Sequence, residues 1–82
     1  MSKNIYTNNH KYLLKVLKQY RKMYKITQKE LADKLDIAQS RISKIENGDR
    51  KIDVMDLIKI SKAIGCNPIE IFSKVVNNWI DE

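Results

Sequence analysis

Hydrogen-bonding side chains of modest length are grouped between residues 39 and 44, and they are the side chains best suited to recognising a ligand. On a helix, which turns by about 100° per residue, Gln39, Ser40 and Lys44 share one side within an arc of about 140°, together with Ser43. Arg41 lies on the border of this side, at about 200°. The other side, near about 240–300°, is apolar and holds Ala38, Ile42 and Ile45.

A helix with one such polar side matches what reading duplex DNA requires. The major groove admits one α-helix and presents donors and acceptors that differ between base pairs. Glutamine can bond bidentately to adenine, lysine can donate to guanine, and serine can do either. We therefore predict that Gln39, Ser40 and Lys44 contact bases, with Ser43 and Arg41 as flanking contacts to bases or phosphates. The alternative is an ordinary surface helix that happens to be polar.

Residues next to this segment could hold the sugar–phosphate backbone. We predict that it is contacted by Thr27, Gln28, Asn47 and Lys51, and by free backbone amides at the start of the helix that Thr27 begins. Residues 1–52 hold 13 Lys/Arg against 5 Asp/Glu, a net charge of +8, whereas residues 53–82 hold 3 against 5, a net charge of −2. This asymmetry indicates a polyanionic partner for one end, and a generally basic, soluble surface explains it equally well.

The elements that position these residues are predicted to be helices. Residues 1–9 are polar and aperiodic, which predicts a flexible N-terminal arm, and a first helix begins near residue 9 or 10. Thr27–Glu30 has the form of a capping box at the start of a short second helix. The third helix covers residues 38–47 and ends where Gly48 can adopt a left-handed conformation.

Two further helices complete the predicted fold. Asp53 caps a fourth helix that Gly65 ends, and Asn67 and Pro68 begin a fifth. The fold class is therefore all-α, a compact five-helix bundle over residues 10–76, with a C-terminal tail at residues 77–82. Apolar spacing predicts inward faces made by Val54, Leu57, Ile58, Ser61 and Ile64 on the fourth helix, and by Ile69, Phe72, Val75 or Val76, Trp79 and Ile80 on the fifth.

Composition excludes several classes of protein. Cys66 is the only cysteine and His10 the only histidine, so an intramolecular disulfide and a Cys/His zinc site are excluded; we expect Cys66 to be buried and His10 to be solvated. The chain has neither the roughly 20 consecutive apolar residues of a membrane span nor a secretory signal, which favours a cytoplasmic protein. Because it also lacks a phosphate-cradling glycine loop, we expect neither an enzyme nor a bound cofactor.

Four blocks carry a resemblance to a known family: RKMYKITQKELA (residues 21–32), QSRISKIENG (39–48), LIKISKAIG (57–65) and PIEIF (68–72). In order and spacing they resemble the opening, the recognition helix, the fourth helix and the fifth helix of the phage-repressor (Cro/cI, Xre-type) helix-turn-helix family, over about residues 13–76. The resemblance implies a lambda-repressor-like bundle that docks its third helix in the major groove. The implied function is sequence-specific regulation of transcription, as a repressor or autoregulator that binds a two-fold symmetric operator.

The chain departs from that family's pattern at two positions. Asp36 stands where the family usually has glycine, but aspartate tolerates a left-handed conformation, so the turn should survive. Ala38 stands where serine or threonine usually caps the recognition helix, a loss of about 1 kcal/mol. In related repressors an arginine of the first helix pairs with the glutamate that ends the recognition helix, so we predict a pair between Arg21 and Glu46. The alternative is that both face solvent.

The expected partners are double-stranded DNA and a second copy of the chain, with no membrane and no small-molecule ligand. One helix reads only a few base pairs, whereas a two-fold dimer would read half-sites about 34 Å apart. We predict that Val75, Val76, Trp79 and Ile80 supply part of the dimer contact, unless they pack within their own chain. The main alternative function is a protein-interaction module with the same fold. RNA binding is weaker still, because the third helix offers no aromatic stacking platform.

Overall fold

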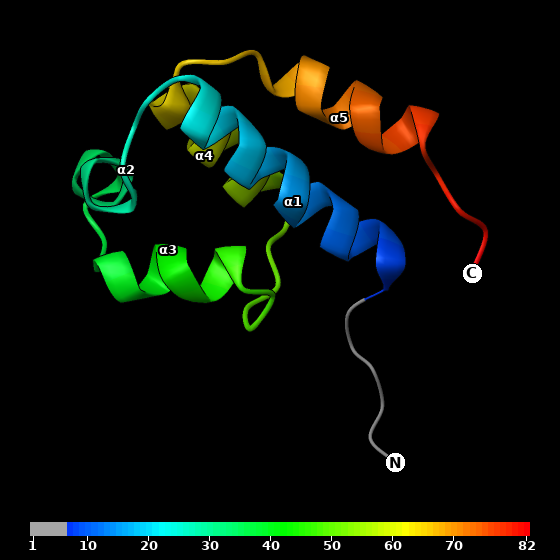
Figure 1. Cartoon of the computed structure of the whole chain (residues 1–82), viewed down its shortest axis with the longest axis horizontal. Coiled ribbons are helices and arrows are strands. Elements are labelled where there is room, and N and C mark those ends of the chain that lie inside the picture. Colours follow the sequence, from blue (N-terminus) through cyan, green and yellow to red (C-terminus); the bar gives the residue numbers. More distant parts are fainter. Residues whose placement is uncertain (1–6) are drawn as a thin grey trace.

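Five helices follow one another along residues 7–82, which are the residues that this computed structural model describes. They are α1 (Asn8–Met23), α2 (Gln28–Leu35), α3 (Gln39–Glu46), α4 (Val54–Ile64) and α5 (Pro68–Asn77). Figure 1 shows α1 between α3 and α5, with α4 behind it, and α1 contacts all three. The predicted all-α bundle of five helices is confirmed, and over this range no helix is long and apolar enough to cross a membrane.

The first helix begins slightly earlier than its apolar pattern indicates. Thr7 caps it, because the Thr7 hydroxyl accepts the backbone N–H of His10 at 3.1 Å. Asn8 and Asn9, which we assigned to a flexible arm, therefore belong to α1. The rest of the predicted arm, residues 1–6, lies outside the described residues.

We expected His10 to be solvated, but its side chain makes a hydrogen bond within the chain. Its Nε2 accepts the backbone N–H of Ile52 at 3.3 Å, which ties the loop before α4 to α1. Partial burial, reinforced by the nearby charge of Lys51, lowers the pKa of His10, so the neutral form that can accept this bond is favoured. Composition could not reveal this role, because the two residues are 42 positions apart.

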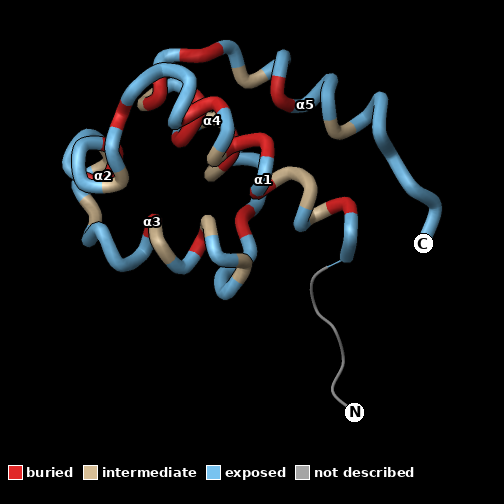
Figure 2. The backbone as a smooth tube through the Cα atoms, viewed as in Figure 1, coloured by how far each residue is buried: buried red, intermediate tan, exposed pale blue. Residues whose placement is uncertain are grey.

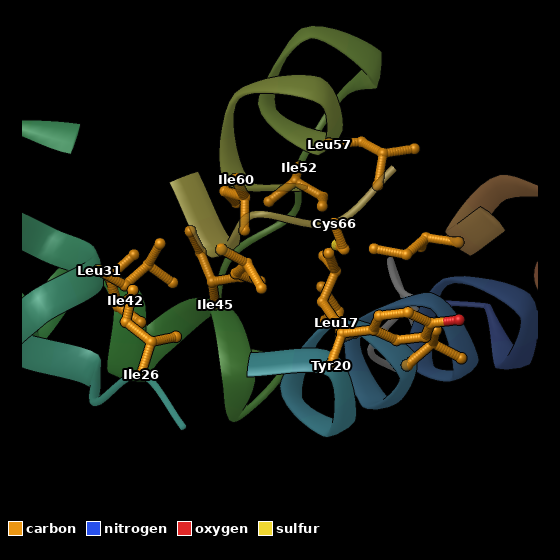
Figure 3. Close-up of a cluster of buried hydrophobic side chains, with 14 of the residues drawn as sticks. Leu17, Tyr20, Ile26, Leu31, Ile42, Ile45, Ile52, Leu57, Ile60 and Cys66 are labelled. Atoms are coloured by element: carbon orange, nitrogen blue, oxygen red, sulfur yellow. The ribbon is translucent and has the colours of Figure 1, made fainter. Parts of the chain in front are cut away.

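One hydrophobic core joins all five helices. Figure 2 marks the buried positions along the backbone in red, and Figure 3 shows a cluster of their side chains. Cys66 lies in this core as expected, and burial raises the pKa of its thiol. The larger part of the core is Leu14, Val16, Leu17, Tyr20, Ile26, Leu31, Ala32, Ile42, Ile45, Ile52, Leu57, Ile60, Ile64 and Ile71.

The inward faces of α4 and α5 differ from those that the spacing predicts. On α4, Ile60 is buried and Val54 is exposed. On α5 the buried residue is Ile71, with 0% of its surface exposed, whereas Phe72 is 57% exposed. Both helices carry apolar residues on more than one side, so periodicity alone cannot tell which side faces the core.

The chain after α5 folds back onto the first turn of α1. Asn9 Nδ2 donates to the carbonyl oxygen of Ile80 at 2.7 Å, and the N–H of Ile80 donates to Asn9 Oδ1 at 3.0 Å. The backbone N–H groups of Asn8 and Asn9 donate to the two carboxylate oxygens of Glu82 at 3.0 and 2.9 Å. We call these four residues the C-terminal clasp. A carboxylate at a helix N-terminus is favourably placed, because it meets unpaired amides and the positive end of the helix dipole.

Candidate nucleic-acid interface

The two sides of α3 are separated as its sequence predicts. Ile42 has 1% of its surface exposed, and both it and Ile45 lie in the cluster of buried side chains that Figure 3 shows. The side with hydrogen-bonding residues faces solvent, since Gln39, Ser40 and Lys44 are exposed. Ser43 is half-buried and Arg41 is exposed. We call Gln39, Ser40, Ser43 and Lys44 the polar face of α3.

The turn between α2 and α3 sets the direction in which this face points. Asp36 ends α2 in a left-handed conformation, with φ 57° and ψ 46°. Its N–H donates to the carbonyl oxygen of Asp33 at 3.2 Å, and the N–H of Ile37 donates to that of Ala32 at 3.0 Å. These bonds use carbonyls that the helix end leaves unpaired. The prediction that aspartate can replace glycine here is confirmed.

A buried ion pair fixes α3 against α1. Arg21 Nε donates to Glu46 Oε2 at 2.5 Å and Arg21 Nη2 donates to Glu46 Oε1 at 3.0 Å, with 9% and 6% of the two side chains exposed. Arg21 Nη1 also donates to the carbonyl oxygen of Ile26 at 2.9 Å, in the chain that leads into α2. The predicted pair is therefore formed, and its arginine holds three segments together: α1, the chain before α2, and the end of α3.

Gln28 joins this cluster, a role that no local pattern in the sequence indicates. Its Nε2 donates to Glu46 Oε1 at 3.0 Å, so one carboxylate oxygen accepts from both Gln28 and Arg21. We predicted Gln28 as a contact to the DNA backbone. The structure leaves its side chain half-buried and its amide nitrogen engaged with Glu46. The two residues are 18 positions apart, and only the packing of α2 against α3 brings them together.

The start of α2 carries the predicted capping box. The N–H of Glu30 donates to the Thr27 hydroxyl at 3.0 Å, and the N–H of Thr27 donates to Glu30 Oε1 at 2.8 Å. These bonds lower the pKa of the Glu30 carboxyl, with the Thr27 backbone bond as the main cause. Two of the amides that we expected to meet a phosphate are thus satisfied within the chain, while Thr27 itself remains exposed.

The loop after α3 presents the remaining predicted contacts. Asn47 caps the end of α3, and Gly48 follows with the left-handed φ of 82° that we predicted. The N–H of Asp49 donates to the carbonyl oxygen of Lys44 at 2.8 Å, which turns the loop back against the helix. Asn47 and Lys51 are both exposed, as a contact to phosphates requires. At the other end of α3, Ala38 makes no side-chain capping bond, as we expected.

The residues predicted for a dimer contact lie far from α3 in the sequence, at the end of α5 and beyond. Val75 is half-buried, and Val76, Trp79 and Ile80 are exposed. The side chain of Ile80 is exposed, although its backbone is hydrogen-bonded to Asn9 in the C-terminal clasp. Exposed apolar residues continue along α5 through Phe72 and Ile69, which we had assigned to the core.

The chain is similar to known proteins both in sequence and in fold. A family model described as helix-turn-helix matches residues 17–71. An XRE-family-like protein from Pseudomonas syringae pv. tomato str. DC3000 is 36% identical to this chain, with 88% of each chain covered and a TM-score of 0.82. No curated protein sequence matches the chain.

Two other solved structures share the fold at lower identity. The restriction–modification controller protein C.Esp1396I, solved as a tetramer in complex with its natural 35 base-pair operator, is 24% identical. The match covers 87% of this chain and 93% of that chain, with a TM-score of 0.77. The clp gene regulator ClgR from C. glutamicum is 17% identical over 93% of this chain and 99% of its own, with a TM-score of 0.78.

Proposed function

The chain belongs to the Xre-type helix-turn-helix family, and from that premise we propose that it is a sequence-specific double-stranded DNA-binding regulator of transcription. It acts as a repressor or autoregulator on a two-fold symmetric operator. The observation that carries the proposal is the exposed polar face of α3, held from behind by buried Ile42 and Ile45. The site of action is the cytoplasm, where a DNA operator is found.

In this proposal each predicted site residue has a defined contact. Gln39, Ser40 and Lys44 meet base edges in the major groove, where amide and ammonium groups can distinguish adenine and guanine from other bases. Arg41 and Ser43 flank them. The DNA backbone is held by Thr27, Gln28, Asn47 and Lys51, with Gln28 using the polar atoms that its bond to Glu46 leaves available.

The Arg21–Glu46–Gln28 cluster supports the same function by holding α3 rigid. A base-reading helix must keep its side chains in register with base edges, and a loose helix would lose discrimination. The pair is buried and bidentate, which gives it a defined orientation as well as attraction. Its position on the inner side of the helix end leaves the polar face free for a ligand.

A second copy of the chain completes the proposed regulator. Val54 and Phe72 border two apolar hollows beside α4 and α5, of about 240 and 400 Å³. Ile69 also lines the first, and the predicted contact Val75 lines the second. The other predicted contacts, Val76, Trp79 and Ile80, are exposed at the end of α5 and just after it. A large apolar patch on a small soluble protein indicates an interface. A self-complementary dimer brings two α3 helices to one duplex, as a two-fold symmetric operator requires.

Selection of bound sequences from a pool of random duplex DNA tests the proposal. We expect enrichment of a two-fold symmetric motif whose half-sites are about 34 Å apart. Binding to that motif should weaken as salt rises, with a linear fall of log affinity against log salt concentration. A pool that shows no enrichment, or an interaction with a protein that is insensitive to salt, would identify the chain as a protein-interaction module instead.

A further inference from the structure

A cleft with three cationic side chains lies beside α3, on the border of its polar face. Arg41 of α3, Arg50 of the loop after α3 and Lys59 of α4 line it, so three separate segments each contribute one positive charge. Its apolar lining includes Ile45, Ile52 and Ile60, all of which are buried in the core. The cleft is therefore a formed hollow with a rigid base rather than a row of lysines on a flat surface.

Within residues 7–82, no ion pair neutralises the positive charges of this cleft. In the described part of the chain, the ion pairs are Arg21–Glu46 and Lys29–Asp33, and neither involves Arg41, Arg50 or Lys59. Asp56 is the acidic residue that lines the cleft, and it belongs to a capping box. Its Oδ2 accepts the N–H of Asp53 at 3.1 Å. The three positive charges outnumber the one carboxylate, so the cleft attracts an anion.

Size and shape narrow the class of anion. The cavity volume is about 220 Å³, which is below the roughly 300–1,000 Å³ of pockets for drug-sized ligands. A single oxyanion group fits it, and two guanidinium groups can each bond a phosphate bidentately while an ammonium adds a point charge.

We infer that this cleft binds one phosphate group, and that the phosphate belongs to the DNA strand that passes the edge of α3. Around the axis of α3, with Gln39 at zero, Arg41 lies at about 200° and Ile45 at about 240°, so both follow the polar face. Both residues line the cleft. A strand that borders the major groove in which α3 lies would thus meet the cleft. The inference rests on the proposed function, and it assigns Arg50 and Lys59, which the sequence did not single out, as phosphate contacts.

Removing one charge from the cleft tests this inference with the full chain and the operator duplex found by selection. Lys59→Gln removes a charge that makes no bond within the described part of the chain, and Lys62→Gln is the matched control. Lys62 is exposed on the same helix but does not line the cleft. We expect the slope of log affinity against log salt to become shallower by about 0.9 for each bound copy with Lys59→Gln, or about 1.8 for the dimer, and to stay unchanged for Lys62→Gln.

A second measurement separates the two sources of phosphate. Inorganic phosphate is titrated into the DNA-free protein and followed by amide NMR, for wild type and for Lys59→Gln. A saturable shift around Arg41 and Lys59, with equal DNA salt slopes for both variants, overturns the DNA strand as the source and assigns a free phosphate. If neither the slope nor the spectrum responds, the cleft is not a phosphate site. If wild type enriches no duplex at all, the proposed function fails, and the phosphate titration still decides the cleft.

Discussion

The α2–α3 region and the α4–α5 region use their apolar residues in opposite ways. On α3 the isoleucines at 42 and 45 are buried and the exposed side is polar, so the core accounts for the whole apolar pattern. On α5 Ile71 is buried and Phe72 is 57% exposed, and Trp79, just after α5, is 60% exposed. An exposed polar helix face is ordinary for a soluble protein, whereas a contiguous exposed apolar surface needs a partner. We therefore propose that the α2–α3 region meets a polar ligand and that the α4–α5 region meets protein.

We expect the largest effect from removing the buried ion pair that holds α3 against α1. Arg21→Ala removes the partner of the buried Glu46 carboxylate, and breaking a buried pair in this way costs about 3–5 kcal/mol in the free energy of unfolding. Urea unfolding measures the loss. The double variant Arg21→Met, Glu46→Leu should recover much of it, because no unpaired charge stays buried. A loss below about 1 kcal/mol for Arg21→Ala would show that the pair does not hold α3 in solution.

The next effect tests whether the apolar region is an interface. Phe72→Ser or Trp79→Ala should weaken self-association by at least about 2 kcal/mol, or roughly 30-fold, as expected for aromatic residues central to an interface. Sedimentation equilibrium measures the dimer constant. Met23→Ser is the matched control, since Met23 is 61% exposed at the end of α1 and does not line the hollows between α4 and α5. Equal constants for all three variants would remove the distinction between the two regions.

We expect a smaller effect from substitution on the polar face of α3. Gln39→Ala should cost about 1–3 kcal/mol in operator affinity, concentrated at one base pair. Because Gln39 is exposed, the free energy of unfolding should change by no more than about 0.5 kcal/mol. Competition binding against single-base operator variants measures the first quantity and urea unfolding the second. An unchanged preference at every base pair would exclude Gln39 from base recognition.

The smallest effect concerns the C-terminal clasp, which lies outside both regions. The backbone N–H of Asn9, with a further contribution from Asn8, lowers the pKa of Glu82 from its ordinary value of 4.5. The stabilisation by the Glu82 carboxylate is therefore complete above pH 4.5 and is lost as the pH falls through the lowered pKa. We expect Glu82→Gln to lower Tm slightly near neutral pH and to match wild type in acid. A difference in Tm that persists in acid would show that the charge is not responsible.

Local rules predicted much of the α2–α3 region. The capping box at Thr27, the left-handed Asp36 and the turn at Gly48 depend on near neighbours in the sequence, and each is present. Because α3 has a single apolar side, the sequence predicts which side of α3 faces the core. The Arg21–Glu46 pair came from family resemblance rather than from spacing, because its residues are 25 positions apart.

The features that could not be predicted from the sequence depend on contacts between distant segments. Spacing on α4 could not choose between Ile60, which is buried, and Val54, which is exposed, because both fit an apolar side. The bonds from Gln28 to Glu46 and from Ile52 to His10 exist only once helices have packed. The cleft of Arg41, Arg50 and Lys59 likewise draws on three segments, so no local motif marks it.

The pairing of Asn9 with Ile80 has a consequence for how the molecule opens. The two residues are 71 positions apart, so their two hydrogen bonds close nearly the whole chain into a ring. The entropy of closing such a loop rises only slowly with its length, by about 0.6 kcal/mol for each doubling, so even this long closure is tolerated. We therefore expect the beginning of α1 and the segment after α5 to open together. Their amide protons should exchange with solvent at matching rates, as one cooperative unit.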